Sequence, residues 1–249
     1  GQVTHPLLGR RLRSALKDIQ FESKVSLRTT PYLNDHRVCG RPVFPAAAYL
    51  EMLWQAAKAW NSRLHVVTGV VLHDLLLFEH EEPHLLQTIL TPTSEDEATL
   101  QLFRWDADAD DWHLHVTGSV HLAQPVSEML QIDLNAVQVR CQQELLSETY
   151  YKQLRAEGLE YGPGFRGIEL LWLGKGEVLG QVRLPEMLVG TASTYGIHPA
   201  LLDACLQLIG ATFVEQGIQT SESALTGKAG ERYLYLPISV ASFRISLPV

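Results

Sequence analysis

Residues 35–50 read DHRVCGRPVFPAAAYL and place His36, Gly40 and Pro45 directly before an unusually apolar segment. Proline is favoured at the first position of a helix, where its missing N–H has no partner to lose. Pro45 therefore predicts a helix that runs to about Trp60. The free N–H groups and the dipole of a helix N-terminus favour negative charge. The stretch thus predicts a glycine-containing loop that brings a histidine to an anion-stabilising helix end.

Polar residues are few in this first helix. Glu51, Gln55 and Lys58 form one narrow stripe, and the remaining residues are alanine, leucine, methionine, tyrosine or tryptophan. A helix of this composition is expected to be buried over most of its circumference.

A second apolar helix is predicted from about Pro199 to Glu215, and it carries a carboxyl group. Between Pro199 and Gly210 the only polar side chains are Asp203 and Gln207, which lie one turn apart and so share a face. Burial of a carboxyl group raises its pKa and can keep it able to donate a proton near neutral pH. We expect Gln207 to hold the Asp203 side chain; an aspartate that only satisfies nearby backbone amides is the alternative.

Segments typical of β-strands flank both helices, and one further helix is indicated. Strands are expected at 21–27, within 64–78, and at 85–90, 99–105, 112–122, 165–172, 177–184 and 233–247, with a helix at 144–157. The tripeptides at 44–46 and 198–200, Phe-Pro-Ala and His-Pro-Ala, open the two apolar helices in a similar way. The pattern predicts an α+β fold in which two helices are each wrapped by an antiparallel sheet.

The pattern divides the chain into three expected segments. Residues 1–123 are expected to form the first half, which carries His36, and residues 141–249 the second, which carries Asp203. A linker is expected over 124–140, where periodicity is lost after a Gln-Pro pair. Few strands follow the second helix, so the second half is expected to be truncated at its C-terminal strands.

Composition limits the class of function. The 249 residues are 46% apolar, which is enough for a large core, and the net charge of −8 argues against a nucleic-acid binder. No apolar run is long enough to predict a membrane span, and no signal peptide is indicated. Three cysteines without metal-type spacing fit reduced thiols and a cytoplasmic protein.

A metal site is not predicted. His113, His115 and His121 could share one face of a strand, but no carboxylate or cysteine completes a recognisable ligand set with them. With ten histidines in the chain, any one of them is usually a surface or core residue. His36 is singled out by its loop position alone.

Four motifs, taken in order, resemble those of the dehydratase domain of a modular type I polyketide synthase, a double-hotdog fold. They are His-x3-Gly-x4-Pro, Tyr-Gly-Pro-x-Phe, His-Pro-Ala-Leu-Leu-Asp-x3-Gln and a late Leu-Pro. The matching residues are His36, Gly40 and Pro45; Tyr161, Gly162, Pro163 and Phe165; His198, Pro199, Asp203 and Gln207; and Leu236 and Pro237. The resemblance implies that Gly162, Pro163, Leu236 and Pro237 border the substrate.

The family's chemistry would use these residues on a 3-hydroxyacyl thioester, tethered by phosphopantetheine to an acyl carrier protein, to give a 2,3-enoyl thioester. The resemblance implies that His36 removes the C2 proton and that Asp203 protonates the departing hydroxyl. The N–H of Gly40 would bind the thioester carbonyl, Gln207 would orient Asp203, and Tyr161 would contact the hydroxyl or place Asp203. No cofactor and no metal are implied.

The implied partners are the acyl carrier protein, neighbouring ketoreductase, ketosynthase and acyltransferase domains, and a second copy of the chain, with no nucleic acid or membrane. The same pair of residues could instead isomerise a double bond, epimerise a centre or close a pyran ring by oxa-Michael addition. A catalytically silent scaffold that binds carrier protein or dimerises is an alternative of another class.

Overall fold

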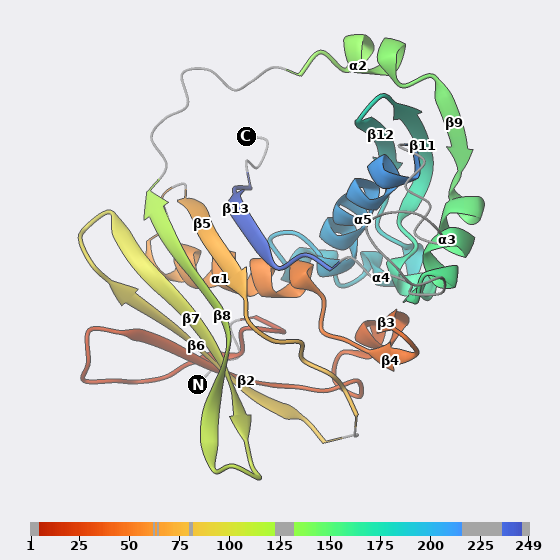
Figure 1. Ribbon diagram of the computed structural model, residues 1–249. Helices are drawn as coiled ribbons and strands as arrows, with labels where there is room; N and C mark the ends of the chain where they lie inside the picture. Colours follow the sequence, from red (N-terminus) through yellow and green to blue (C-terminus); the bar gives the residue numbers. More distant parts are fainter. Residues whose placement is uncertain are drawn as a thin grey trace, which may run out of the picture.

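The computed structural model describes residues 5–61, 63, 65–79, 82–122, 132–215 and 236–245. Two lobes lie side by side, each with a long helix against an antiparallel sheet (Figure 1). Helix α1 (Ala46–Trp60) packs on the first sheet and helix α5 (Pro199–Glu215) on the second. None of the helices within these ranges is long and apolar enough to cross a membrane.

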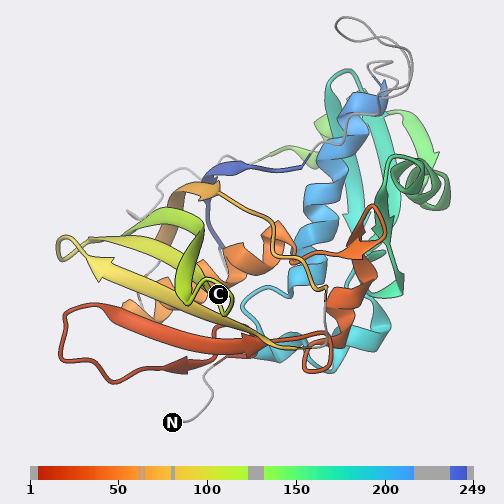
Figure 2. The same cartoon turned by 60° about the horizontal axis from the view of Figure 1, so that its bottom comes forward.

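The first sheet has seven antiparallel strands in the order β1-β2-β6-β7-β8-β5-β13. In this order they are β1 (Arg10–Arg11), β2 (Ile19–Val25), β6 (His84–Pro92), β7 (Glu97–Asp106), β8 (Asp111–Leu122), β5 (His65–Leu72) and β13 (Ser239–Phe243). Alternate residues of β2 are buried, because successive side chains of a strand point to opposite faces. The sheet wraps around α1 in Figure 2, and the two share one apolar core.

Helix α1 is buried over most of its circumference, as its composition predicts. Its start differs slightly from the expectation. Pro45 has an extended conformation, with φ −73° and ψ 149°, and the helix begins at Ala46. The carbonyl of Pro45 accepts the first helical hydrogen bonds, from the N–H groups of Ala48 and Tyr49. Pro45 is therefore the N-cap of α1 and not its first helical residue. Helix α5, in contrast, begins at Pro199 as predicted.

The second sheet has three described strands in the order β12-β11-β9. They are β12 (Glu177–Val182), β11 (Ile168–Gly174) and β9 (Gln143–Leu146), and the helices nearby are α2 (Leu134–Arg140), α3 (Ser147–Ala156) and α4 (Glu186–Val189).

Two sequence-based expectations about this half of the chain are corrected by the structure. The segment expected to be helical from 144 begins as β9, because it pairs with β11. The end of the expected linker forms α2, capped by Asp133, whose carboxylate accepts two backbone N–H bonds; residues 124–131 lie outside the described part.

Strand β13 corrects the expected division of the chain. Its residues were expected to close the second half, but β13 pairs with β5 and completes the first sheet (Figures 1 and 2). Val67 and Val70 of β5 are buried, and β13 pairs with the backbone edge that β5 would otherwise leave open. Of the expected strand 233–247, residues 233–235 and 246–247 lie outside the described part. The boundaries at 123 and 141 stay predictions.

A small third sheet joins the lobes. It has the order β10-β3-β4, formed by β10 (Leu159–Tyr161), β3 (His36–Val38) and β4 (Arg41–Pro42). Tyr161 of the second half pairs directly with His36 of the first. Within the described residues there are also three short 3₁₀ turns: η1 (Pro31–Asp35), η2 (Pro163–Phe165) and η3 (Ala192–Thr194).

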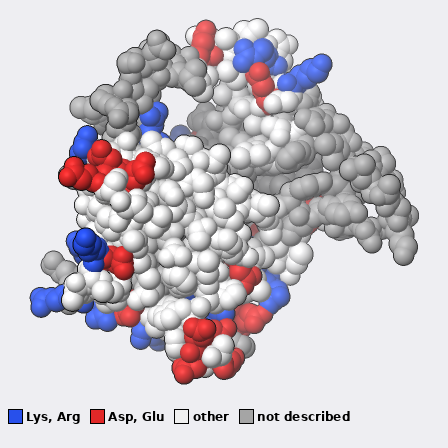
Figure 3. All heavy atoms as spheres, turned by 60° about the vertical axis from the view of Figure 1, so that its left-hand side comes forward, with Lys and Arg blue, Asp and Glu red and all other residues white. Residues whose placement is uncertain are grey.

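Charged groups are scattered on the face shown in Figure 3, where blue and red atoms alternate around a wide uncharged area. Among the described residues on that face, basic side chains do not merge into one continuous patch.

Residues 5–9, His-Pro-Leu-Leu-Gly, form an N-terminal motif, and its glycine provides a test of the packing. Gly9 has φ +75°, and a Cβ there would collide with the carbonyl oxygen of Glu22. Gly176 has a similar φ of +69° but open space around it. We expect Gly176→Ala to lower the free energy of unfolding by about 1 kcal/mol, the cost of the left-handed backbone alone. Gly9→Ala should lower it by at least about 1 kcal/mol more.

The measurement is urea denaturation of both variants beside the parent chain. Equal losses of unfolding free energy in the two variants would contradict the collision at Gly9.

Candidate active site

His36 is held in one tautomer by the backbone. It follows η1 and lies in β3, where its side chain is 11% exposed. Its Nδ1 lies 2.9 Å from the carbonyl oxygen of Val43, and a carbonyl only accepts, so Nδ1 carries the proton and donates it. The unprotonated Nε2 then faces Asp203, with 3.8 Å between Nε2 and Oδ1. This is the geometry of a histidine prepared to accept a proton.

Asp203 is buried on α5 and has a single amide donor. Gln207 donates from Nε2 to Asp203 Oδ2 at 2.8 Å, as the one-turn spacing predicts. Burial raises the pKa of the Asp203 carboxyl, an effect that His36 and the bond from Gln207 only partly offset. A carboxyl group in this setting retains its proton to higher pH than an exposed aspartate and can act as an acid.

Gln207 is itself fixed at both ends of its amide. Its Nε2 also donates to the carbonyl of Phe165 at 3.0 Å, and its Oε1 accepts from the Tyr151 hydroxyl at 3.1 Å. Tyr151 was not singled out by sequence, because only the fold brings α3 beside α5. The amide orientation of Gln207, and hence the donor presented to Asp203, is therefore set by two other elements.

A cavity of about 370 Å³ opens beside the pair. His36, Asp203 and Gln207 line it together with Tyr161, Leu236 and Pro237, so these six predicted residues are brought together. Most other lining residues are apolar, and they include Val38, Val43, Phe44, Leu72, Leu75 and Leu206. A pocket in which a few polar groups converge between mostly apolar walls fits a chain-like acyl substrate.

Three predicted site residues do not line this cavity: Gly40, Gly162 and Pro163. Gly40 forms the β3–β4 turn with φ +77°, a conformation that favours glycine. The N–H of Gly162 donates to the Asp35 carbonyl at 2.7 Å, which ties the Tyr-Gly-Pro motif to the residue before His36. Their roles toward substrate stay predictions.

Tyr161 lines the cavity beside His36. Its ring centroid is 5.6 Å from that of His36, and burial raises the pKa of its hydroxyl. The hydroxyl is therefore protonated near neutral pH and available as a hydrogen-bond donor.

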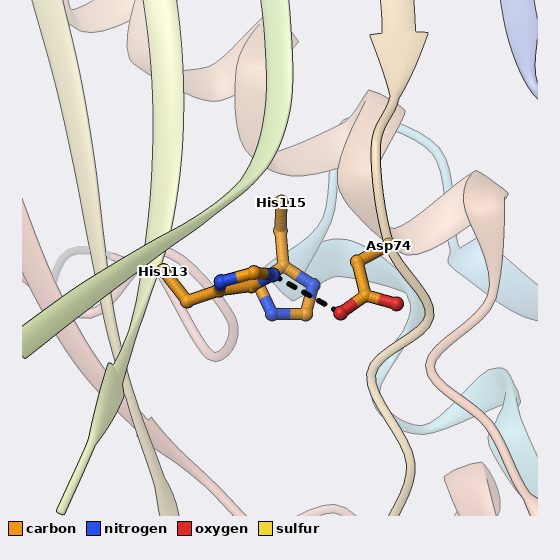
Figure 4. A group of neighbouring side chains, drawn as sticks. All are labelled: Asp74, His113 and His115. Carbon is orange, nitrogen blue, oxygen red and sulfur yellow. Dashed lines mark hydrogen bonds and ion pairs between the residues drawn. The ribbon is translucent and has the colours of Figure 1, made fainter. Parts of the chain in front are cut away.

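A second polar cluster joins Asp74, His113 and His115, which point toward one another in Figure 4. The expectation that no carboxylate completes a set with these histidines is wrong, because the end of β5 runs beside β8 and brings Asp74 to 3.1 Å from His113 Nε2. Arg104 Nε lies 3.4 Å from His115 Nε2 and places a guanidinium cation against the cluster. That charge opposes a second cation, so we do not assign a metal here.

Comparisons with known proteins agree over most of the chain. The family described as polyketide synthase dehydratase domain matches residues 5–104, and the one described as polyketide synthase dehydratase N-terminal domain matches residues 131–249. The spectinabilin polyketide synthase system protein NorB of Streptomyces orinoci is 32% identical over 216 residues, 83% of this chain. The chain spans 9% of NorB and between 4% and 11% of other curated relatives.

Three of the similar solved structures cover nearly all of this chain. The dehydratase domain from the CurF module of curacin polyketide synthase has a TM-score of 0.86 and 30% identity, covering 98% of this chain and 84% of that one. Inactive mutants of the CurK dehydratase, one with a histidine replaced by phenylalanine and one with an aspartate replaced by asparagine, have a TM-score of 0.82 and 30% identity, covering 96% and 80%.

The raised pKa of Asp203 predicts how stability depends on pH. Between the ordinary value of 3.8 and the raised one, the folded chain holds a proton that the unfolded chain has released. Stability therefore falls as pH rises through this window, by at most about 1.4 kcal/mol per pH unit. Asp203→Asn does not titrate, and its side-chain oxygen can still accept from Gln207.

The measurement is urea unfolding of both proteins from pH 4 to pH 7.5. Relative to the asparagine variant, the parent chain should lose unfolding free energy as pH rises. Buried His115 and His198, whose pKa values are lowered to about 4, are present in both proteins and cancel in the difference. Parallel curves would show that Asp203 titrates normally.

Proposed function

The chain belongs to the dehydratase domains of polyketide synthases, and we propose that it removes water from a 3-hydroxyacyl thioester to give a 2,3-enoyl thioester. Its fold is the double hotdog of that family. The observation that carries the proposal is the pairing of His36 with Asp203, 3.8 Å apart at the wall of an apolar cavity. A base and an acid supplied from opposite halves can act on neighbouring carbons of one acyl chain.

Each proton has a defined path. His36 Nε2 takes the C2 proton, and the electrons of that C–H bond form the C2=C3 double bond. The C3–O bond breaks as Asp203 donates its proton to the hydroxyl, and water leaves. Asp203 is then a carboxylate and His36 an imidazolium. Transfer of the proton from His36 to Asp203 restores both groups, and their 3.8 Å separation suits that return.

Supporting groups act on the charge that develops at the thioester. We propose that the Gly40 N–H binds the thioester carbonyl as enolate character builds, a contact whose loss typically costs about 10²–10³ in rate. Tyr161, which keeps its proton, donates to the substrate hydroxyl or steadies Asp203. Leu236 and Pro237 contact the acyl chain from the cavity wall.

The inactive mutants of the CurK dehydratase support the assignment of the pair. In that protein, replacement of one histidine or one aspartate gives an inactive enzyme. The same two residue types face each other here, and neither is missing from the chain. Because both His36 and Asp203 are present, the alternative of a catalytically silent scaffold is disfavoured.

Partners and setting follow from the relatives, which are polyketide synthases. We propose that an acyl carrier protein delivers the substrate on phosphopantetheine, and that ketoreductase, ketosynthase and acyltransferase domains neighbour this one in a homodimeric, cytoplasmic assembly. The proposed step needs no cofactor, because both proton transfers use side chains.

The test is mass spectrometry of a 3-hydroxyacyl carrier-protein thioester incubated with the chain. We expect loss of one water with the parent chain and a fall in rate of at least about 10²-fold for His36→Phe and for Asp203→Asn. His73→Phe removes an exposed imidazole whose Nε2 lies 2.9 Å from the Thr117 hydroxyl, and it serves as the matched control. Its rate should equal that of the parent chain.

Two results would overturn the proposal. Retention of a tenth or more of the rate in either dyad variant would show that the pair does not carry the chemistry. A product of unchanged mass but altered structure would identify an isomerase, epimerase or cyclase instead.

A further inference from the structure

We propose that Glu51 is a positioning residue that sets the distance between Asp203 and His36, an inference that rests on the proposed function. Glu51 lies in the middle of α1, is 0% exposed and does not line the cavity. A carboxyl group buried to this extent is strongly unfavourable unless its oxygens are hydrogen-bonded. The hydrogen-bond partners of Glu51 indicate its structural role.

Four N–H donors converge on Glu51. Gly196 donates to Oε1 at 2.7 Å and Ile197 to Oε2 at 3.1 Å, both from the backbone. Gln55 donates from Nε2 to Oε1 at 2.9 Å, and His5 Nε2 lies 3.1 Å from the same oxygen. The donors come from the N-terminal motif, from α1 and from the segment before α5. One side chain thus joins three parts of the chain.

The tautomer of His5 follows from its other nitrogen. Nδ1 accepts the backbone N–H groups of Leu7 and Leu8, at 3.3 and 3.2 Å, so it is unprotonated. The proton therefore lies on Nε2, which donates to Glu51. The N-terminal motif is thereby anchored to α1 through a carboxylate acceptor.

The bonds to Gly196 and Ile197 fix the start of α5. The next residue, His198, caps that helix: its carbonyl accepts from Leu201 and Leu202, and its Nδ1 accepts from Ala200 at 3.1 Å. Asp203 follows within the first turns of α5. A shift of the segment before the cap would therefore move the acid relative to the base.

The same segment reaches His36 through packed rings. The His198 ring lies 4.8 Å from that of Tyr32, Tyr32 lies 5.9 Å from Phe165, and Phe165 lies 5.2 Å from His36. Gly196 also has no space to move toward α1, because a Cβ there would collide with the Trp54 ring. Glu51 therefore acts on both catalytic groups from outside the cavity.

Glu51→Gln tests this role with little change in volume. The new amide presents N–H groups to a site that already supplies four N–H donors, so at least one bond must break. We expect kcat to fall about tenfold or more with KM changed less than about threefold, because misplacement of a catalytic group by about 1 Å can cost 10²-fold in rate. Glu97→Gln, which alters another histidine–glutamate pair at an exposed site, is the matched control and should leave kcat unchanged.

A second readout separates positioning from stability. In a ¹⁵N-labelled chain, the amide resonances of Gly196 and Ile197 should shift in Glu51→Gln, and the change should extend along α5 to Asp203. Rates are measured where denaturation curves show the variant to be folded. A kcat within twofold of the parent chain, or a loss that only follows the unfolded fraction, would overturn the proposal.

His5→Phe provides a milder variant if Glu51→Gln does not fold. It preserves a ring against Tyr195 and removes one of the four donors. We expect a smaller fall in kcat, at constant KM, and an unchanged kcat would count against the network. An inactive parent chain would defeat the proposed function, whereas the movement of α5 resonances to Asp203 would still decide the role of Glu51.

Discussion

Two buried carboxyl groups, Glu51 on α1 and Asp203 on α5, govern how the halves of this chain meet. Glu51 receives four N–H donors, so both of its oxygens are satisfied as acceptors. Asp203 receives one amide donor and faces His36, and burial raises its pKa. Glu51, with four donors, is suited to holding neighbouring segments in place, whereas Asp203, with one amide donor, is suited to transferring a proton.

The base depends on both halves of the chain. Its strand, β3, pairs with β10, and Asp35 beside it binds the backbone of Gly162 and Gly164. The imidazole is oriented by a carbonyl of its own half, that of Val43. The site therefore forms only where the two halves of the chain are joined.

Much of the fold and of the candidate site was predicted from short stretches of sequence. The proline-opened helices, the one-turn spacing of Asp203 and Gln207, and the motif around Tyr161 can each be interpreted within a few residues of sequence. The partner of β13, the carboxylate beside His113 and the hydroxyl of Tyr151 could not, because each depends on pairing between distant segments. Glu51 was visible only as part of a polar stripe, because three of its four donors lie 46, 145 and 146 residues away in the sequence.

The pairing of β13 with β5 has a consequence for synthesis of the chain. During translation the first lobe emerges early and can collapse around α1, but its sheet stays incomplete until residues 239–243 have left the ribosome. Closing a contact between such distant segments is intrinsically slow. The first sheet is therefore completed only after the second lobe has been made, and until then β5 presents an unpaired backbone edge.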